Sequence, residues 1–318
     1  MRLQHLLRAR SAAVSAWALG IVITLVAGAP AAAQTDSQGV RVAVQDRSLG
    51  FGDHVVVRGR VAGASAGIPV TLQFRPARET EWRSAKTVQT REGGRYRVGA
   101  RMWRSGRVRV QAGGASSRAA APVAPALSAA RPVRVRARVA TTHVRRHVTA
   151  GRRVRVAGAL RPGGRGRVVA LQLRRGGRWR TVDRDRTAGN GRYRLRERMT
   201  AARSLPARVR FRGDRLNAPA VRRLGRVNGY RSAHASWYGP GLYGNHVACG
   251  GRLYPGTVGV AHKWLPCGTR LTFRYHGRVV RARVIDRGPF VAGREFDLTA
   301  ALKSRLGFPD VGVVQVSQ

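Results

Sequence analysis

Residues 260–271 read VAHKWLPCGTRL and residues 284–290 read VIDRGPF, with a hairpin pattern between them. Residues 269–275 alternate between apolar and polar side chains, residues 276–277 are His-Gly, and residues 278–284 alternate again. Glycines and prolines cluster where these stretches end, as sharp strand crossings require, because glycine adopts positive φ without strain. The pattern predicts a small β-barrel.

Two more stretches complete the series. Residues 235–241 read ASWYGPG, and residues 295–299 read EFDLT, just before a short helical pattern at residues 300–306. In this order, the pieces resemble the RlpA family and, more distantly, expansins and other double-psi β-barrels. The resemblance covers about residues 233–318 and implies a double-psi β-barrel domain there.

The resemblance also implies an activity. In RlpA-like proteins that have it, this is lytic transglycosylase action: the C6 hydroxyl of N-acetylmuramic acid attacks its own anomeric carbon and leaves a 1,6-anhydro product. His262 and Asp286 fall on the family's proposed catalytic His and Asp. Asp297 falls on the strand position at which expansin-like barrels carry their essential acid. One principal acid/base group suffices for this chemistry, which fits a segment with few carboxylates.

The residues themselves favour the same site. Asp286 follows an apolar strand end and is the leading acid/base, with His262 as its partner and Asp297 as a supporting or alternative acid. Trp237 and Tyr238 precede a Gly-Pro-Gly loop and are candidates for a sugar-stacking platform. Arg287, next to Asp286, is a third candidate substrate-binding residue.

Other roles for these residues remain open. Asp286 before Arg-Gly-Pro could cap a turn, and His262 could be a structural histidine. Trp237 and Tyr238 could instead pack one end of the barrel. Active RlpA members carry a Glu in the stretch that here reads GGRL at residues 250–253. The alternative function is therefore a non-catalytic, expansin-like protein that binds cell-wall glycan, and a third possibility is a structural envelope protein.

The two cysteines, Cys249 and Cys267, both lie in this segment. An even pair in an exported protein favours a disulfide, which would close a loop of roughly 18 residues and stabilise by about 3 kcal/mol. A metal pair would need C-x-x-C spacing and a nearby His cluster, which are absent. We expect no metal site and no organic cofactor.

The preceding part of the chain contains a repeat. Residues 54–61 and 153–160 have matching alternating patterns, and each is followed by a second strand containing Leu-Gln, then a tryptophan, Trp82 or Trp179, and a Gly-Arg-Tyr-Arg tetrad. This order predicts two immunoglobulin-like β-sandwich modules, at residues 38–112 and 132–226. We expect the tryptophan and tyrosine of each module to fill its core, with sugar stacking by the tryptophans as the alternative.

The remaining boundaries follow from composition. Residues 113–131 are rich in Ala, Ser and Pro and are predicted to be a flexible linker, and the barrel domain is placed at residues 233–318 after a junction near residues 224–233. The fold class is therefore all-β: two immunoglobulin-like sandwiches followed by a double-psi barrel.

The amino-terminal 33 residues have the pattern of a secretion signal. Arginines precede an uncharged apolar run, and the run ends in Ala-Ala-Ala before Gln34. The chain of 318 residues has a formal net charge of +47, almost all of it from arginine. We expect export to the cell envelope (periplasm or cell wall), peptidoglycan strands as the partner, anionic wall polymers as further partners of the arginine-rich surfaces, no nucleic acid, and no membrane span after signal cleavage.

Overall fold

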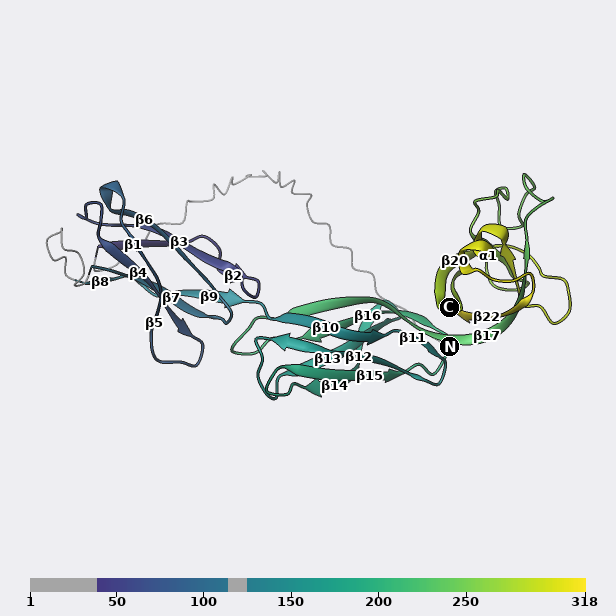
Figure 1. Cartoon of the computed structure of the whole chain (residues 1–318), viewed down its shortest axis with the longest axis horizontal. Coiled ribbons are helices and arrows are strands. Elements are labelled where there is room, and N and C mark those ends of the chain that lie inside the picture. The colour runs from purple at the N-terminus through teal and green to yellow at the C-terminus, as the bar shows by residue number, and fades with distance from the viewer. Residues whose placement is uncertain (1–38, 114–124) are drawn as a thin grey trace, which may run out of the picture. The chain divides into compact units, whose positions relative to one another are not determined.

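The computed structural model describes residues 39–113 and 125–318 (Figure 1). Almost every regular element in these ranges is a strand, and the buried apolar residues form three separate clusters. This arrangement confirms the all-β fold class. The predicted signal segment, residues 1–33, lies outside the described residues. In the part of the chain that is described, no helix is long and apolar enough to cross a membrane.

The first sandwich buries its core between two sheets. One sheet has the strand order β1-β3-β6, and the other has the order β2-β9-β7-β4-β5, with β8 paired to β7. Alternating valines of β3 and β7 face each other across the core. The strands are β1 (Val40–Val44), β2 (Ser48–Leu49), β3 (His54–Val61), β4 (Pro69–Pro76), β5 (Arg83–Gln89), β6 (Arg95–Arg101), β7 (Gly106–Ala112), β8 (Ala126–Leu127) and β9 (Arg131–Val135), with a 3-10 turn at Glu92–Gly94.

The second sandwich repeats this plan. One sheet has the order β10-β12-β15, and the other runs β14-β13-β16-β17, with β11 paired to β17. Its strands are β10 (Arg138–Arg145), β11 (His147–Thr149), β12 (Arg153–Arg161), β13 (Val168–Arg175), β14 (Arg178–Arg186), β15 (Arg192–Arg198), β16 (Ser204–Phe211) and β17 (Ala220–Tyr238). The repeated alternating patterns therefore become β3 and β12, as predicted.

Each sandwich is locked by one tyrosine against one glycine. Tyr96 is buried and donates its hydroxyl to the carbonyl of Arg41 at 2.8 Å, and Tyr193 donates to Ala140 at 2.8 Å. A Cβ at Gly158 would lie 2.0 Å from the Ala140 carbonyl oxygen and 2.6 Å from the Tyr193 hydroxyl. The glycine and the tyrosine that the two modules share therefore contact each other, since only glycine leaves room for the tyrosine hydroxyl beside it.

The tryptophans do not take the predicted place. Trp82 and Trp179 are half-buried and belong to neither core cluster. Arg109 stacks on Trp82 with 4.2 Å from its guanidinium carbon to the ring centroid, and Arg208 stacks on Trp179 at 4.1 Å. The prediction that they fill the cores is wrong, because they pack on the outer faces of the sheets, where long arginine side chains cover their rings.

Two predicted boundaries also differ from the structure. Within the predicted linker, residues 114–124 lie outside the described residues, but β8 and the start of β9 pair with β7 and belong to the first sandwich. At the predicted junction near residues 224–233 there is no break. Strand β17 is continuous for 19 residues, pairing with β16 up to Asn228 and with β22 from Arg231. One strand thus serves two sheets, because its inward positions are apolar on both sides of the junction.

The carboxyl-terminal strands close into a ring in the order β17-β21-β18-β20-β19-β22, with β22 pairing back to β17. The elements are β18 (Gly259–Ala261), β19 (Arg270–Tyr275), β20 (Arg278–Asp286), β21 (Phe296–Thr299), α1 (Ala300–Leu306) and β22 (Gly312–Ser317). The predicted hairpin and the predicted helix at residues 300–306 are confirmed. Thr299 caps α1 by accepting from the Leu302 N–H, and Gly307 ends it at φ 63°.

Candidate active site in the carboxyl-terminal barrel

Two carboxylates lie on one face of the barrel sheet. Asp286 ends β20 and Asp297 is in β21, and both are in register with Ala261 of the short strand β18 that lies between them. Residues in register across a sheet project to the same face, so the two side chains flank Ala261. The one-residue irregularity at Ile285 is what brings Asp286 into this register.

Three buried polar atoms lie together at Asp297, one of them its own. Its Oδ1, the Ser236 hydroxyl and the Tyr238 hydroxyl are all shielded from solvent, and none has a well-aligned hydrogen-bond partner among the described residues. Ser236 is directly in register with Asp297, and Tyr238 is two residues farther along the same strand. The Ser236 hydroxyl interacts with Asp297 and the Tyr238 hydroxyl with Asp286, so these groups form one polar cluster.

The pKa of Asp297 is raised, chiefly because burial disfavours its charged form. The nearby charge of Asp286 acts in the same direction, whereas Ser236 and Arg294 oppose it. Burial also raises the pKa of the Tyr238 phenol, and the charges of Asp286 and Asp297 raise it further. These couplings indicate that Tyr238 and the two carboxylates form one cluster.

Backbone amides fix Asp286 in place. Its Oδ1 accepts from the N–H of Ala248 at 2.8 Å and from the N–H of Arg287 at 2.9 Å. The Ala248 bond joins the long loop after β17 to the site. Cys249, the next residue, is disulfide-bonded to Cys267, as predicted, and donates its N–H to Ile285. Asp286 is therefore a positioned carboxylate, held at the meeting point of two loops.

His262 does not pair with the Asp286 side chain, contrary to the prediction. Its ring packs on the fully buried Phe296 at a centroid distance of 4.9 Å, and its Nδ1 accepts from the N–H groups of Trp264 at 3.0 Å and Leu265 at 2.9 Å. Only the backbone N–H of His262 reaches Asp286, at its carbonyl. The His262 ring contacts Phe296, and Phe296 projects to the opposite face of β21 from its neighbour Asp297, so His262 and the two carboxylates lie on opposite faces.

The bonds of His262 also fix its protonation. An Nδ1 that accepts two N–H bonds carries no proton, so the neutral ring is protonated at Nε2, which lies 3.7 Å from Glu295. Burial lowers the pKa of His262, the charges of Arg231 and Arg287 add to this, and Glu295 opposes it. His262 therefore holds the residue 263–265 loop as a neutral acceptor.

The predicted substrate-binding residues are engaged elsewhere. Arg287 donates to the carbonyls of His262 at 3.3 Å and Leu265 at 3.0 Å, so its guanidinium holds the loop. Trp237 lies in register with the buried Leu298, on the face away from Tyr238, and donates from Nε1 to Asp310 at 2.7 Å. The predicted Trp237–Tyr238 platform is therefore not formed, because adjacent strand residues project to opposite faces.

An exposed aromatic residue that the sequence reasoning missed lies beside the site. Phe290 is 85% exposed. A Cβ placed on Gly288 would lie 3.7 Å from the Phe290 ring and 3.9 Å from the Cβ of Ala261, so Gly288 separates the ring from the floor between the carboxylates. The signal was present in the sequence, since Phe290 ends the quoted VIDRGPF stretch, a loop position where an apolar ring has no core to fill.

Comparison with known proteins shows what the barrel region is similar to. A family model described as Lytic transglycolase matches residues 231–318. A relative from Synechocystis sp., named "Probable endolytic peptidoglycan transglycosylase RlpA", is 38% identical over 110 residues, which are 31% of this chain and 34% of the relative. A relative of the same name from Aquifex aeolicus is 40% identical over 87 residues, 27% of this chain and 38% of the relative.

Residues 231–318 form an RlpA-like double-psi β-barrel. The chain spans only about a third of the length of these curated relatives. Among solved structures, a tetra-tandem repeat in the extending region of a large adhesion protein matches with 14% identity and a TM-score of 0.31, over 80% of this chain and 65% of that one. A likeness of that size supports no argument about the sandwiches.

The RlpA-like barrel departs from the active pattern in the loop at residues 250–253. Gly250 and Gly251 have φ values of 91° and 85°, and Arg252 donates to the Gly244 carbonyl at 2.6 Å. These residues build a tight turn in place of the acidic side chain that the resemblance led us to expect. No group of three or more His, Cys, Asp or Glu residues in the described ranges could hold a metal ion.

Proposed function

We propose that the RlpA-like barrel is a lytic transglycosylase that cleaves the glycan strands of peptidoglycan to 1,6-anhydro products. One observation supports this most directly: Asp286 and Asp297 flank Ala261 on a single face, and burial raises the pKa of Asp297. Pairs of carboxylates in unequal environments are typical of enzymes that break glycosidic bonds.

Asp297 is proposed as the general acid, because its raised pKa favours the protonated form. It gives its proton to the glycosidic oxygen as the bond from that oxygen to the anomeric carbon breaks. The Asp286 carboxylate accepts the proton of the C6 hydroxyl as the O6–C1 bond forms, and its charge stabilises the positive charge that develops on the ring. Transfer of the proton from Asp286 back to Asp297 restores the enzyme, and no water is consumed.

His262 and Arg287 are proposed as positioning residues. Both bind the loop of residues 262–267, which the disulfide joins to the loop that supplies Ala248. Ala248 in turn donates to Asp286. Loss of either residue would therefore act on the reaction through the placement of Asp286. Phe290 is proposed to contact the apolar face of a sugar ring beside the carboxylates.

The setting of this activity is also a proposal. We propose that residues 1–33 are a secretion signal and that the mature chain acts in the cell envelope, with peptidoglycan as its partner. The two sandwiches are proposed to be non-catalytic, because the paired carboxylates of the second, Asp183 and Asp185, accept backbone N–H bonds from β15.

The experiment incubates the purified chain with peptidoglycan and examines the soluble products for anhydro-muropeptides. We expect Asp286→Asn and Asp297→Asn each to lower the rate by at least about a hundredfold, the size of a general acid–base contribution. Asp46→Asn, at an exposed carboxylate of the first sandwich, is the matched control and should leave the rate unchanged. Unchanged product formation in both barrel variants would exclude this site.

A second function is favoured by the tight Gly250–Gly251 turn and by two very exposed rings, Trp264 at 84% and Phe290 at 85%. In that case the barrel would bind wall glycan without cleaving it, as expansin-like proteins do. The two functions differ in the same assay. Absence of anhydro products, together with retention on wall material that Phe290→Ala weakens, would rule out the lyase and support the binding protein.

A further inference from the structure

A stacked arginine–tryptophan pair occurs at the same place in both sandwiches. In the second, Arg208 of β16 lies over the Trp179 ring and is oriented by Gln172 of β13, whose Oε1 accepts from the arginine Nε at 2.8 Å. Gln172 is only 5% exposed and also donates to Thr181 at 3.0 Å. The equivalent residues of the first sandwich are Gln73, Arg109 and Trp82. The arginine–tryptophan pair on the outer face of the sheet is therefore a structural feature that both sandwiches share.

The second sandwich adds a groove beside this pair. Ala170 of β13 is in register with Arg184 on one neighbouring strand and with Arg210 on the other. Because alanine is short, the two arginines stand on either side of a gap. The gap belongs to a groove that also reaches Gln172 and Thr181. Further arginines line it: Arg165, Arg212 and Arg215.

The first sandwich provides a natural comparison. The position of Ala170 is occupied there by Thr71, which is in register with Thr87 and with Gln111. The two threonine hydroxyls are 2.9 Å apart and hydrogen-bonded. The equivalent surface is thus neutral and filled, so the arginine-lined groove is specific to the second module.

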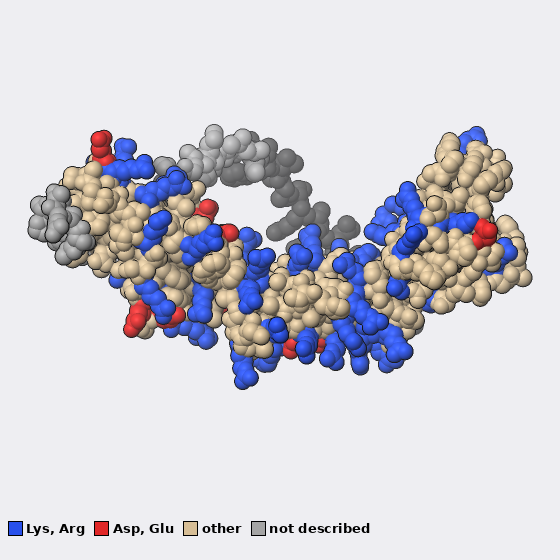
Figure 2. Space-filling model, viewed as in Figure 1, with Lys and Arg blue, Asp and Glu red and all other residues tan. Residues whose placement is uncertain are grey.

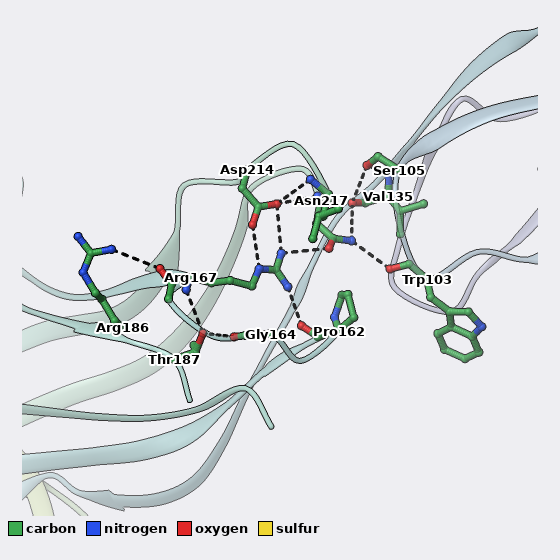
Figure 3. A network of polar contacts seen from close by, with 12 residues as sticks. Trp103, Ser105, Val135, Pro162, Gly164, Arg167, Arg186, Thr187, Asp214 and Asn217 are labelled. Carbon is green, nitrogen blue, oxygen red and sulfur yellow. Dashed lines mark hydrogen bonds and ion pairs between the residues drawn. The ribbon is translucent and has the colours of Figure 1, made fainter. Parts of the chain in front are cut away.

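Nearby carboxylates do not neutralise the groove. Asp214, at its edge, is committed to Arg167 at 2.8 and 3.3 Å, as Figure 3 shows. Asp183 and Asp185 of β14 point the other way, accepting from the backbone N–H groups of residues 196 and 194 on β15. No ion pair to Arg184 or Arg210 occurs in the ranges that the structure describes. In Figure 2, Lys and Arg side chains greatly outnumber acidic ones over the visible face of this module.

We propose that this groove binds an anionic glycan, with carboxylate or phosphate groups of the polymer bound by Arg184 and Arg210. Guanidinium groups suit such anions because they offer paired, charge-assisted hydrogen bonds. The proposal is independent of cleavage, because the groove lies on the second sandwich and its binding is measured without the barrel's reaction.

Fluorescence anisotropy of the full chain with labelled oligogalacturonate, a carboxylate-bearing sugar chain, tests the groove. We expect the double variant Arg184→Gln/Arg210→Gln to bind at least about tenfold more weakly, as expected when charge-assisted hydrogen bonds are lost. The control is Arg155→Gln/Arg196→Gln, which removes the same charge from exposed arginines of the opposite sheet and should change affinity less than about twofold. An equal loss in both double variants would overturn the proposal.

The preference of the groove for a sugar chain is tested separately. Thr87→Arg/Gln111→Arg should create a second site on the first sandwich and raise the stoichiometry. Tighter binding of polyphosphate, an oligonucleotide or a neutral maltodextrin than of oligogalacturonate would show that the groove is not a site for anionic glycan.

Discussion

Asp297 shows at the residue scale how burial sets both chemistry and stability. Its pKa is raised by burial, so the folded barrel favours the protonated carboxyl and is less stable when this carboxyl is ionised. The resulting stability is present at low pH and is lost as pH rises through the raised pKa. We therefore expect Asp297→Asn, which carries no charge, to gain melting temperature relative to the parent as pH rises from about 4 to about 8, by about 1–3 °C. The rate of product formation by the parent protein should fall as pH rises through the raised pKa of Asp297, because the proposed general acid loses its proton.

His262 offers a second test at this scale. Its Nδ1 accepts two backbone N–H bonds, and the Oδ1 of an asparagine can occupy nearly the same position. We expect His262→Asn to keep most of the stability and activity, and His262→Ala to lose about 1–3 kcal/mol, because two N–H groups are left without an acceptor. Urea unfolding and product formation are the measurements. Full loss of activity in a stably folded His262→Asn protein would instead assign the ring a chemical role.

The tyrosine–glycine contact belongs to the scale of strands and sheets. In the second sandwich it joins β10, β12 and β15, since the Tyr193 hydroxyl reaches the Ala140 carbonyl across Gly158. A methyl group at Gly158 would overlap both atoms. We expect Gly158→Ala to lower the free energy of unfolding by about 2–4 kcal/mol. Gly189→Ala, where a Cβ meets nothing within 4 Å, should change it by less than about 0.5 kcal/mol.

The net charge acts at the scale of the whole molecule. With +47 on 318 residues and few acidic groups, attraction to a polyanionic wall should be strong and screened by salt. We expect retention on wall material to fall steeply between about 0.05 M and about 0.5 M salt. Cleavage of a short, uncharged glycan fragment should change much less, because the proposed reaction depends on two carboxylates and an aromatic residue. Equal salt dependence of retention and cleavage would contradict this separation of roles.

Much of this architecture is written in local sequence patterns. The alternation at residues 54–61 and 153–160 becomes β3 and β12, and the hairpin around residues 276–277 and the helix at residues 300–306 form as predicted. The Cys249–Cys267 pair also forms. These features depend on residues that are close in the chain: on the alternation of apolar and polar side chains and on turn residues. They can therefore be predicted from one sequence. Asp286 and Asp297 were also predicted from the motifs that contain them, and their catalytic roles stay predictions.

What the tertiary structure alone decided is which face each side chain occupies and what lies opposite. His262 and Asp286 are close in the motif series, but the His262 ring packs on Phe296, and the irregularity at Ile285 turns Asp286 to the other face. Trp179 is a large apolar residue of the kind expected in a core, yet it lies on the outer face of the sheet, where Arg208 stacks on its ring. The sequence alone determined the strands, the order of the barrel motifs and the net charge. The register between distant strands determined which side chains share a face with Asp286 and Asp297, because a shift of one residue exchanges the two faces of a sheet.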